Sequence, residues 1–207
     1  MKKMILIVMF SLMMATTAFA IPLLPGTFGV VPTGVAPLSG TLVASVINAP
    51  FTGVDANGIV KFTGFLTQKV YSTSAGMLFT YLFSSGSGSA NVIERLSTTD
   101  FTGWTTDVNA LLTPGNPPGT FERSSDGSTV SGAHFAIGAG QTSSLLWIQT
   151  NATSYKIGST SLIDGGIANI STYAPSAPVP EPGSLALLGM GLLGMIGYGK
   201  ARFGKKS

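Results

Sequence analysis

The sequence predicts an all-β protein whose folded part is an antiparallel β-sandwich of Ig-like or jelly-roll type. Runs rich in Val, Ile, Phe, Tyr and Thr follow one another at short intervals, and turn sequences such as 55–58 and 164–166 separate them. A helical repeat of apolar residues is almost absent outside the two termini. We therefore expect short strands joined by tight turns, which favour antiparallel pairing.

The predicted β-sandwich domain spans 41–173. Its expected strands are 41–47, 59–71, 77–83, 91–97, 102–108, 131–136, 143–150, 161–164 and 167–173. The preceding segment, 21–40, is rich in Pro and Gly and is expected to be an extended lead-in, because prolines disfavour helices and central strands. A β-solenoid is the alternative architecture. Against it, the tripeptide Phe-Thr-Gly recurs at 51–53, 62–64 and 101–103 with unequal spacings.

The first twenty residues have the order of a secretory signal peptide. Lys2 and Lys3 precede the apolar stretch 4–14, and the small residues Ala18 and Ala20 follow it. We predict a signal helix over 1–20 that the Sec translocon exports and that signal peptidase removes by cleavage after Ala20. A permanent N-terminal anchor is the alternative, which the well-placed Ala-x-Ala site disfavours.

The C-terminus has three parts in a fixed order. Residues 174–182 are a Pro-rich linker, 183–199 are apolar and Gly-interrupted, and 200–207 form a basic tail. The apolar core of the second part, 185–198, would rise about 21 Å as a helix against a hydrocarbon thickness of about 30 Å. We predict a short transmembrane helix in the inner membrane, with the basic tail holding its end in the cytoplasm.

This C-terminus resembles the PEP-CTERM sorting domain of exopolysaccharide-producing Gram-negative bacteria. The resemblance lies in the stretch Val179, Pro180, Glu181, Pro182 and Gly183, followed by the apolar segment and the basic end. It implies that an exosortase reads the signal, that the precursor is transiently held in the inner membrane, and that the product reaches the cell surface or the extracellular matrix. It also implies an association with exopolysaccharide.

Charge is sparse and is concentrated at the ends. The chain has a formal net charge of +3, and 9% of its residues are charged. Six of the eleven Lys and Arg residues lie in the two terminal segments, whereas residues 21–178 hold five cations and seven anions, a net charge of −2. Without a basic stripe to neutralise phosphates, the body is not expected to bind nucleic acid.

The residue inventory leaves little for catalysis or metal binding. The chain has no cysteine and one histidine, His134, so a zinc site is excluded, and no Gly-x-Ser-x-Gly elbow exists. The Asp-x-Asn spacing at 55–57 is read as a turn and not as a calcium loop, because no distal Glu follows. We expect no cofactor, no metal and no enzymatic activity; a glycan-active hydrolase is a minor alternative.

The expected role is structural or adhesive within an exopolysaccharide matrix. A carbohydrate-binding module is the main alternative, and for that function Trp104 is the candidate glycan contact because its polar neighbours favour exposure. Trp147 lies in the apolar run 145–148 and is expected in the core. An ice-binding protein is a further minor alternative, disfavoured by the lack of a regular Thr-x-Thr ladder.

Overall fold

A computed structural model of the chain describes residues 21–177, which form eleven antiparallel strands and no helix. This confirms the predicted all-β class. The strands are β1 (Ile21–Pro22), β2 (Thr41–Val54), β3 (Val60–Thr73), β4 (Gly76–Ser85), β5 (Arg95–Thr98), β6 (Thr106–Ala110), β7 (Thr120–Arg123), β8 (Val130–Ala133), β9 (Leu146–Thr150), β10 (Ser154–Ile163) and β11 (Ile167–Ser176).

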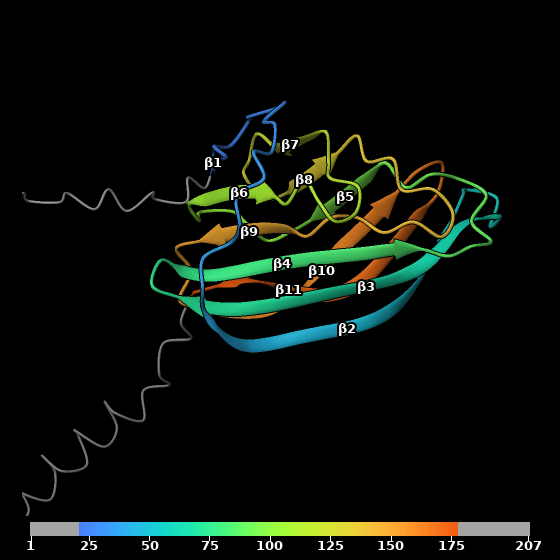
Figure 1. The fold of residues 1–207 in the computed structure, drawn as a ribbon. Coiled ribbons are helices and arrows are strands. Elements are labelled where there is room, and N and C mark those ends of the chain that lie inside the picture. Colours follow the sequence, from blue (N-terminus) through green and yellow to red (C-terminus); the bar gives the residue numbers. More distant parts are fainter. Residues whose placement is uncertain (1–20, 178–207) are drawn as a thin grey trace, which may run out of the picture.

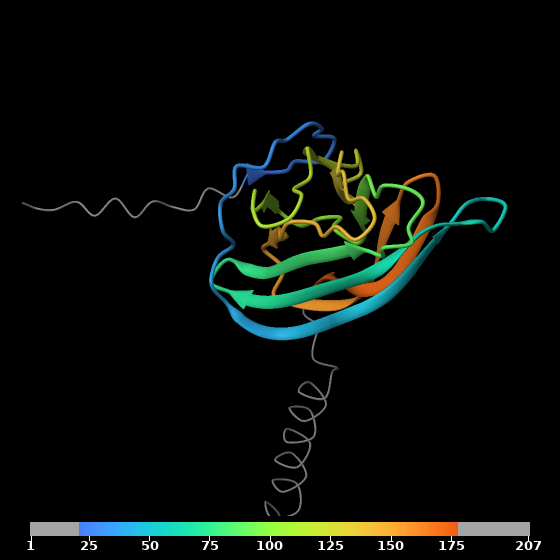
Figure 2. The same cartoon turned by 45° about the vertical axis from the view of Figure 1, so that its right-hand side comes forward.

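All eleven strands belong to one sheet, in the order β1-β6-β9-β4-β3-β2-β11-β10-β5-β8-β7. The sheet curls, so that β4, β3 and β2 face β10 and β11 across the interior (Figures 1 and 2). The two halves are joined where β2 meets β11, through the single residue pair Val54–Ile167. The predicted pair of separate sheets is therefore replaced by one curled sheet, and neither an Ig-like nor a jelly-roll sandwich is confirmed.

One hydrophobic core fills the space between the two halves. Phe79 of β4 packs edge-on against Phe101, which precedes β6, with ring centroids 5.9 Å apart. A buried polar contact crosses the same space, because the Tyr81 hydroxyl of β4 lies 3.2 Å from the Thr98 hydroxyl of β5. Burial raises the pKa of Tyr81 to about 12, so this phenol remains a neutral hydrogen-bonding group.

The long strand β3 shows why the sheet has one buried and one solvent-facing side. The side chains on one side of β3 are buried, among them Phe62, Leu66, Gln68 and Val70, whereas Phe65, Thr67 and Lys69, which alternate with them, face outward, as the two-residue period of a strand requires. Each outward residue of β3 lies opposite an outward residue of β4, for example Lys69 opposite Thr80. The same alternation therefore builds the core and a continuous outer face.

β2 and β11 pair only through Val54 and Ile167, so most of β2 has no hydrogen-bonded neighbour on the β11 side. A side chain of β3 bonds to the main chain of β11 where β2 does not. Gln68 of β3 is fully buried, and its amide nitrogen donates to the Tyr173 carbonyl of β11 at 2.7 Å. The Tyr173 N–H in turn donates to the Gln68 side-chain oxygen at 2.7 Å. One glutamine thus supplies both hydrogen bonds that a neighbouring strand would have made.

The lead-in is part of the folded body. Its first residue pairs with β6 through Ile21–Val108, and Val30 makes an isolated bridge to Phe121 of β7, so it contacts both edges of the sheet. It then crosses the outer face towards β2 (Figure 1), where the Trp147 indole N–H donates to the Val35 carbonyl at 3.0 Å. Trp147 is buried as predicted, although it lies beneath the lead-in on the outer face.

The buried cation Arg123 of β7 fixes the beginning of this lead-in. Its guanidinium donates to four main-chain carbonyls, at distances of 2.8 to 3.1 Å. The acceptors are the carbonyls of Leu23, Phe101, Trp104 and Gly127. Because main-chain dipoles solvate the charge, an arginine can lie in the interior here without a carboxylate partner.

The predicted helices at the two ends lie outside the described residues. Within residues 21–177 the structure contains no helix of the length and apolarity that crossing a membrane requires.

Candidate functional site

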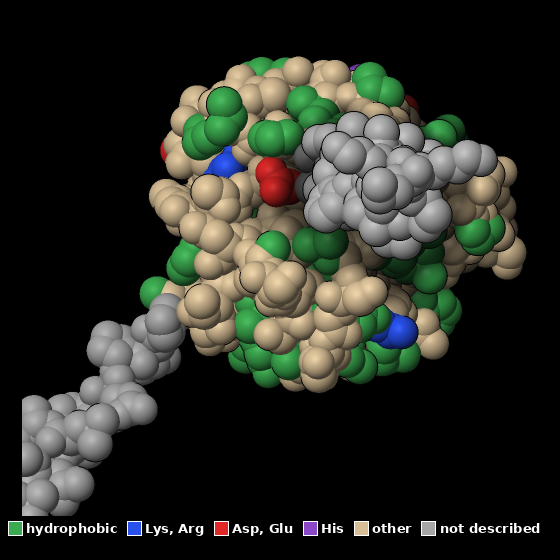
Figure 3. Space-filling model, turned by 60° about the vertical axis from the view of Figure 1, so that its left-hand side comes forward, with side chains coloured by type: hydrophobic (Ala, Val, Ile, Leu, Met, Phe, Trp, Pro, Cys, Tyr) green, Lys and Arg blue, Asp and Glu red, His purple; other side chains and the backbone are tan. Residues whose placement is uncertain are grey.

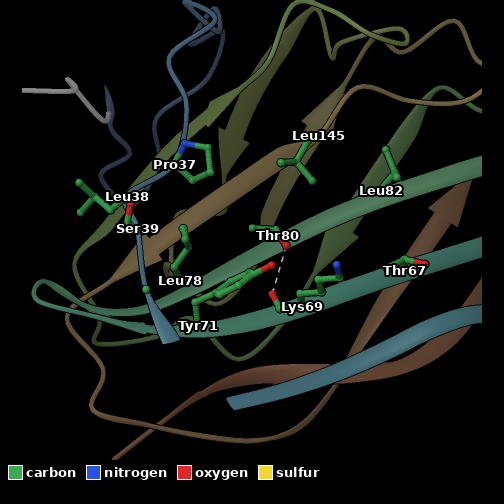
Figure 4. A pocket seen from close by; sticks show the side chains of 11 residues that line it. Pro37, Leu38, Ser39, Thr67, Lys69, Tyr71, Leu78, Thr80, Leu82 and Leu145 are labelled. Carbon is green, nitrogen blue, oxygen red and sulfur yellow. Dashed lines mark hydrogen bonds between the residues drawn. The ribbon is translucent and has the colours of Figure 1, made fainter. Parts of the chain in front are cut away.

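A hollow on the outer face of β3 and β4 is the best-formed candidate binding site in the described body. It has a volume of about 410 Å³. Thr67, Lys69 and Tyr71 of β3 and Leu78, Thr80 and Leu82 of β4 form its floor. Pro37, Leu38, Ser39 and Gly40 of the lead-in, together with Leu145, form its walls, as Figure 4 shows.

Strand register brings these side chains to one place. The pairs Thr67–Leu82, Lys69–Thr80 and Tyr71–Leu78 are direct neighbours across β3 and β4. Side chains of opposed residues in a sheet point to the same face, so the three pairs form a strip of six. In Figure 4, Lys69 and Tyr71 project from β3 on the side where Pro37 and Leu145 stand.

A second hollow continues the first along the same two strands. It shares Thr67 and Leu82 with the first hollow and adds Asn48, Phe65 and Ser84. Phe65 is 52% exposed, an unusual position for so large an apolar ring. We refer to the two hollows together as the outer groove.

A bulge in β2 positions the asparagine of this second hollow. The register of β2 against β3 shifts between Val46 and Ala49, and Asn48 there has a φ of 49°. Asparagine tolerates this left-handed backbone better than most residues. Its side-chain oxygen accepts a hydrogen bond from the Thr67 hydroxyl at 3.1 Å, which holds both polar groups at the groove.

The first hollow of the outer groove is mostly apolar, the second is about equally polar and apolar, and the polar groups stand at defined positions. The Lys69 ammonium provides positive charge, and the hydroxyls of Ser39, Thr67, Tyr71 and Thr80 provide hydrogen-bonding groups. The Thr80 hydroxyl also donates to the Lys69 carbonyl at 3.3 Å, as the dashed line in Figure 4 shows. No Asp or Glu is among the described residues that line either hollow.

Trp104, the glycan contact predicted from the sequence, is half-buried and packs against the core. It lies in the turn before β6 and lines two hollows, of about 250 and 440 Å³. One is shared with Pro22 and Leu24 at the beginning of the described chain, and the other with Pro175 and Ala177 at its end. Trp104 therefore lies between the two ends of the body and apart from the outer groove.

The groups considered for catalysis or metal binding do not converge. His134 is exposed in a turn after β8, with a φ of 57°. The Asp55 carboxylate accepts hydrogen bonds from the main-chain N–H groups of Asn57 and Ile59 and pairs with Lys61 at 3.2 Å, which is turn chemistry. Within residues 21–177 no group of three or more His, Cys, Asp or Glu side chains could hold a metal ion.

The surface beyond the groove is poor in charge. Figure 3 shows one face on which acidic and basic side chains are few and hydrophobic side chains are scattered among hydroxyl, amide and main-chain atoms. The 9% of charged residues in the sequence accounts for this appearance. Such a surface offers hydrogen bonds and apolar contacts over most of its area.

Sequence reasoning selected Trp104 and missed the outer groove. The signal that could have revealed the groove is the alternation Phe65, Thr67, Lys69 and Tyr71 on the outward side of one strand. The wall formed by residues 37–40 leaves no such signal, because it depends on contacts with strands far along the chain. The other predicted site residues lie outside the described residues: Ala18, Ala20, Val179, Pro180, Glu181, Pro182 and Gly183.

Comparison with known proteins identifies the C-terminal segment. Residues 178–201 match the family model of the PEP-CTERM protein-sorting motif, as the sequence predicts. The motif marks an exported protein with a membrane-anchored precursor that an exosortase processes. Searches of the curated proteins and of the solved structures each gave no significant match.

Proposed function

We propose that this protein is a non-enzymatic component of the cell surface or extracellular matrix, and that its body adheres to exopolysaccharide through the outer groove. The sorting motif supports export and processing. The observation that carries glycan binding is the groove itself, in which Tyr71 and Phe65 stand on the outward side of one strand. The matrix destination and the choice of exopolysaccharide follow from the association of this sorting signal with exopolysaccharide producers.

The chemistry of the groove suits a sugar chain. Pyranose rings have apolar faces that pack on aromatic and aliphatic side chains, and their hydroxyls need partners such as Thr67, Thr80 and Asn48. Tyr71 and Phe65 are six residues apart on β3, a distance of about 20 Å. Both hollows lie along that distance, so the groove suits an extended polymer better than a compact molecule.

The same lining favours binding over hydrolysis. Glycosidases commonly use a pair of Asp or Glu side chains on either side of the scissile bond. The described lining of the outer groove contains no carboxylate, and its one cation is Lys69. A bound glycan would therefore meet stacking surfaces and hydrogen-bonding groups, but no acid and base pair.

Binding of exopolysaccharide isolated from the native host, with and without groove substitutions, tests the proposed role. Tyr71→Ala and Phe65→Ala should each weaken binding about tenfold, because each removes one stacking surface. Phe28→Ala is the matched control: Phe28 is a 69% exposed ring in the lead-in that does not line the groove. Unchanged binding by both groove variants would overturn the assignment of the groove.

Intact mass and cellular location test the sorting step separately. Wild type should lose residues 1–20 and the segment that follows the Pro-Glu-Pro motif and reach the surface or the medium, whereas Glu181→Ala should keep its tail and stay in the inner membrane. An exosortase-deletion strain is the control and should reproduce the variant. A wild-type protein that retains residues 183–207 would mean that the motif is a linker before a permanent anchor.

A further inference from the structure

The cations of the described body are almost all occupied by internal partners. Ion pairs join three of them to carboxylates at 2.7 to 3.2 Å, and main-chain carbonyls surround a fourth. The pairs are Lys61 with Asp55, Arg95 with Glu122, and Lys156 with Asp100, and the fourth cation is Arg123. Lys69 is the fifth, and among residues 21–177 no carboxylate lies within 4.0 Å of its ammonium.

The unpaired cation lies inside the outer groove. Lys69 is half-buried on β3, between Thr67 and Tyr71 and opposite Thr80. Its stem is flanked by groove residues, and its ammonium has no carboxylate within 4.0 Å among residues 21–177. A cation without a protein anion is available to pair with the anion of a ligand, and the attraction is stronger near a protein surface than in bulk water.

We propose that the outer groove selects acidic glycans and that Lys69 binds the carboxylate of a hexuronic acid unit. This inference rests on the proposed function, since it names the class of sugar that the same groove takes. Charge complementarity carries the inference: one unpaired cation stands in a described lining without any carboxylate. The Tyr71 and Thr80 side chains border Lys69, so ring contacts and hydroxyl contacts are available beside the charge.

Oligogalacturonate and its carboxyl-reduced form are the probes that test this. They share one backbone, and only the first carries carboxylates, so the comparison isolates the charge. Wild type should bind oligogalacturonate about tenfold more tightly than the reduced form, the effect of one hydrogen-bonded charge pair. Added salt should weaken binding of the charged probe and leave binding of the reduced probe nearly unchanged.

Variants identify the residue responsible. Lys69→Gln should bind both probes equally, and Lys69→Arg should keep most of the preference because it keeps the charge. Lys156→Gln is the matched control: it removes one exposed cation that lies outside the groove, and the preference should persist. A thermal unfolding midpoint for each variant shows that the fold is intact, as expected for a half-buried or exposed position.

The outcomes separate the two proposals. Equal binding of both probes by wild type would overturn the acidic preference and leave glycan binding in place. Binding of neither probe, together with failure of the host exopolysaccharide to bind, would overturn both proposals. Binding of dodecanoate at Lys69 in place of either sugar would assign the groove to an amphiphile and overturn both as well.

Discussion

Arg123 stabilises the fold through hydrogen bonds from a buried side chain to main-chain carbonyls of distant segments. A buried guanidinium with four carbonyl partners joins the lead-in, the loop before β6 and the turn after β7. Arg123→Ala would leave the buried carbonyls of Leu23 and Gly127 without their guanidinium donor and should lower the free energy of unfolding by about 3 kcal/mol. Urea unfolding of the purified protein measures the loss. Arg123→Lys should recover part of it, because an ammonium reaches fewer carbonyls; equal stability of wild type and Arg123→Ala would contradict the anchoring role.

The hydrogen bonds to the Asp126 carboxylate make the stability of the protein depend on pH. The Asp126 carboxylate accepts a hydrogen bond from the Ser124 hydroxyl at 2.6 Å and another from the Ser128 main-chain N–H. These bonds, first of all the one from Ser124, lower the pKa of Asp126 from 3.8 to about 2. A carboxylate with a depressed folded-state pKa stabilises the protein above pH 3.8, and this contribution is lost as the pH falls through about 2. NMR titration of the Asp126 carboxyl carbon should give the low value in wild type. Ser124→Ala should return the pKa towards 3.8, and a wild-type midpoint near 3.8 would refute the prediction.

Among the strands, the junction of β2 and β11 is the point where the sheet depends on a side chain. Gln68→Leu keeps a comparable volume but leaves the Tyr173 N–H and carbonyl without partners, so we expect a loss of about 2 kcal/mol in the free energy of unfolding. Hydrogen exchange at the Tyr173 amide should accelerate in this variant. Gln141→Leu, a change in an exposed loop, is the control and should leave that amide protected. Unchanged Tyr173 exchange in Gln68→Leu would show that the glutamine does not replace a strand.

The packing of β2, β3 and β4 predicts a difference between two glycines. A Cβ on Gly64 of β3 would meet the Ser84 carbonyl of β4 and the Phe51 ring of β2, whereas a Cβ on Gly88, in the loop after β4, would meet nothing within 4 Å. Gly64→Ala should therefore destabilise the protein by about 2 kcal/mol through overpacking. Gly88→Ala should be close to neutral. The midpoints of urea unfolding compare the two, and equal midpoints would count against close packing at Gly64.

The same elements show what sequence can and cannot predict. The strands β3 and β4 were predicted because their long apolar and β-branched runs are local signals. β7 was missed because Thr120–Arg123 holds two charges in four residues, and its arginine is buried by carbonyls from distant segments. β10 begins at Ser154, earlier than predicted, since the whole strand, its first half included, pairs with β11 over ten residues. The wall of the outer groove could not be predicted for the same reason. The lead-in that forms it is held by the hydrogen bond from the Trp147 indole to the Val35 carbonyl, and these two residues are 112 positions apart in the sequence.

At the scale of the whole molecule, both ends of the described body lie together. β1 and the C-terminal end of β11 lie at the end of the sheet opposite the loop that joins β2 and β3 (Figure 1), and Trp104 lines one hollow with Pro22 and another with Pro175. The predicted signal peptide and the sorting motif therefore adjoin the same end of the described body in the sequence. The outer groove lies along the outward face of β3 and β4.

The placement of the two tryptophans has an optical consequence. Trp147 lies beneath the lead-in with its indole N–H bonded to Val35, and Trp104 lies where the two ends meet. They are the only tryptophans in the chain, so intrinsic fluorescence contains these two signals alone. Displacement of the lead-in at Val35 would expose the Trp147 indole and move its emission to longer wavelength, whereas displacement of residues 175–177 would change the surroundings of Trp104. The protein thus carries an intrinsic fluorescent reporter for the lead-in and another for the end of β11.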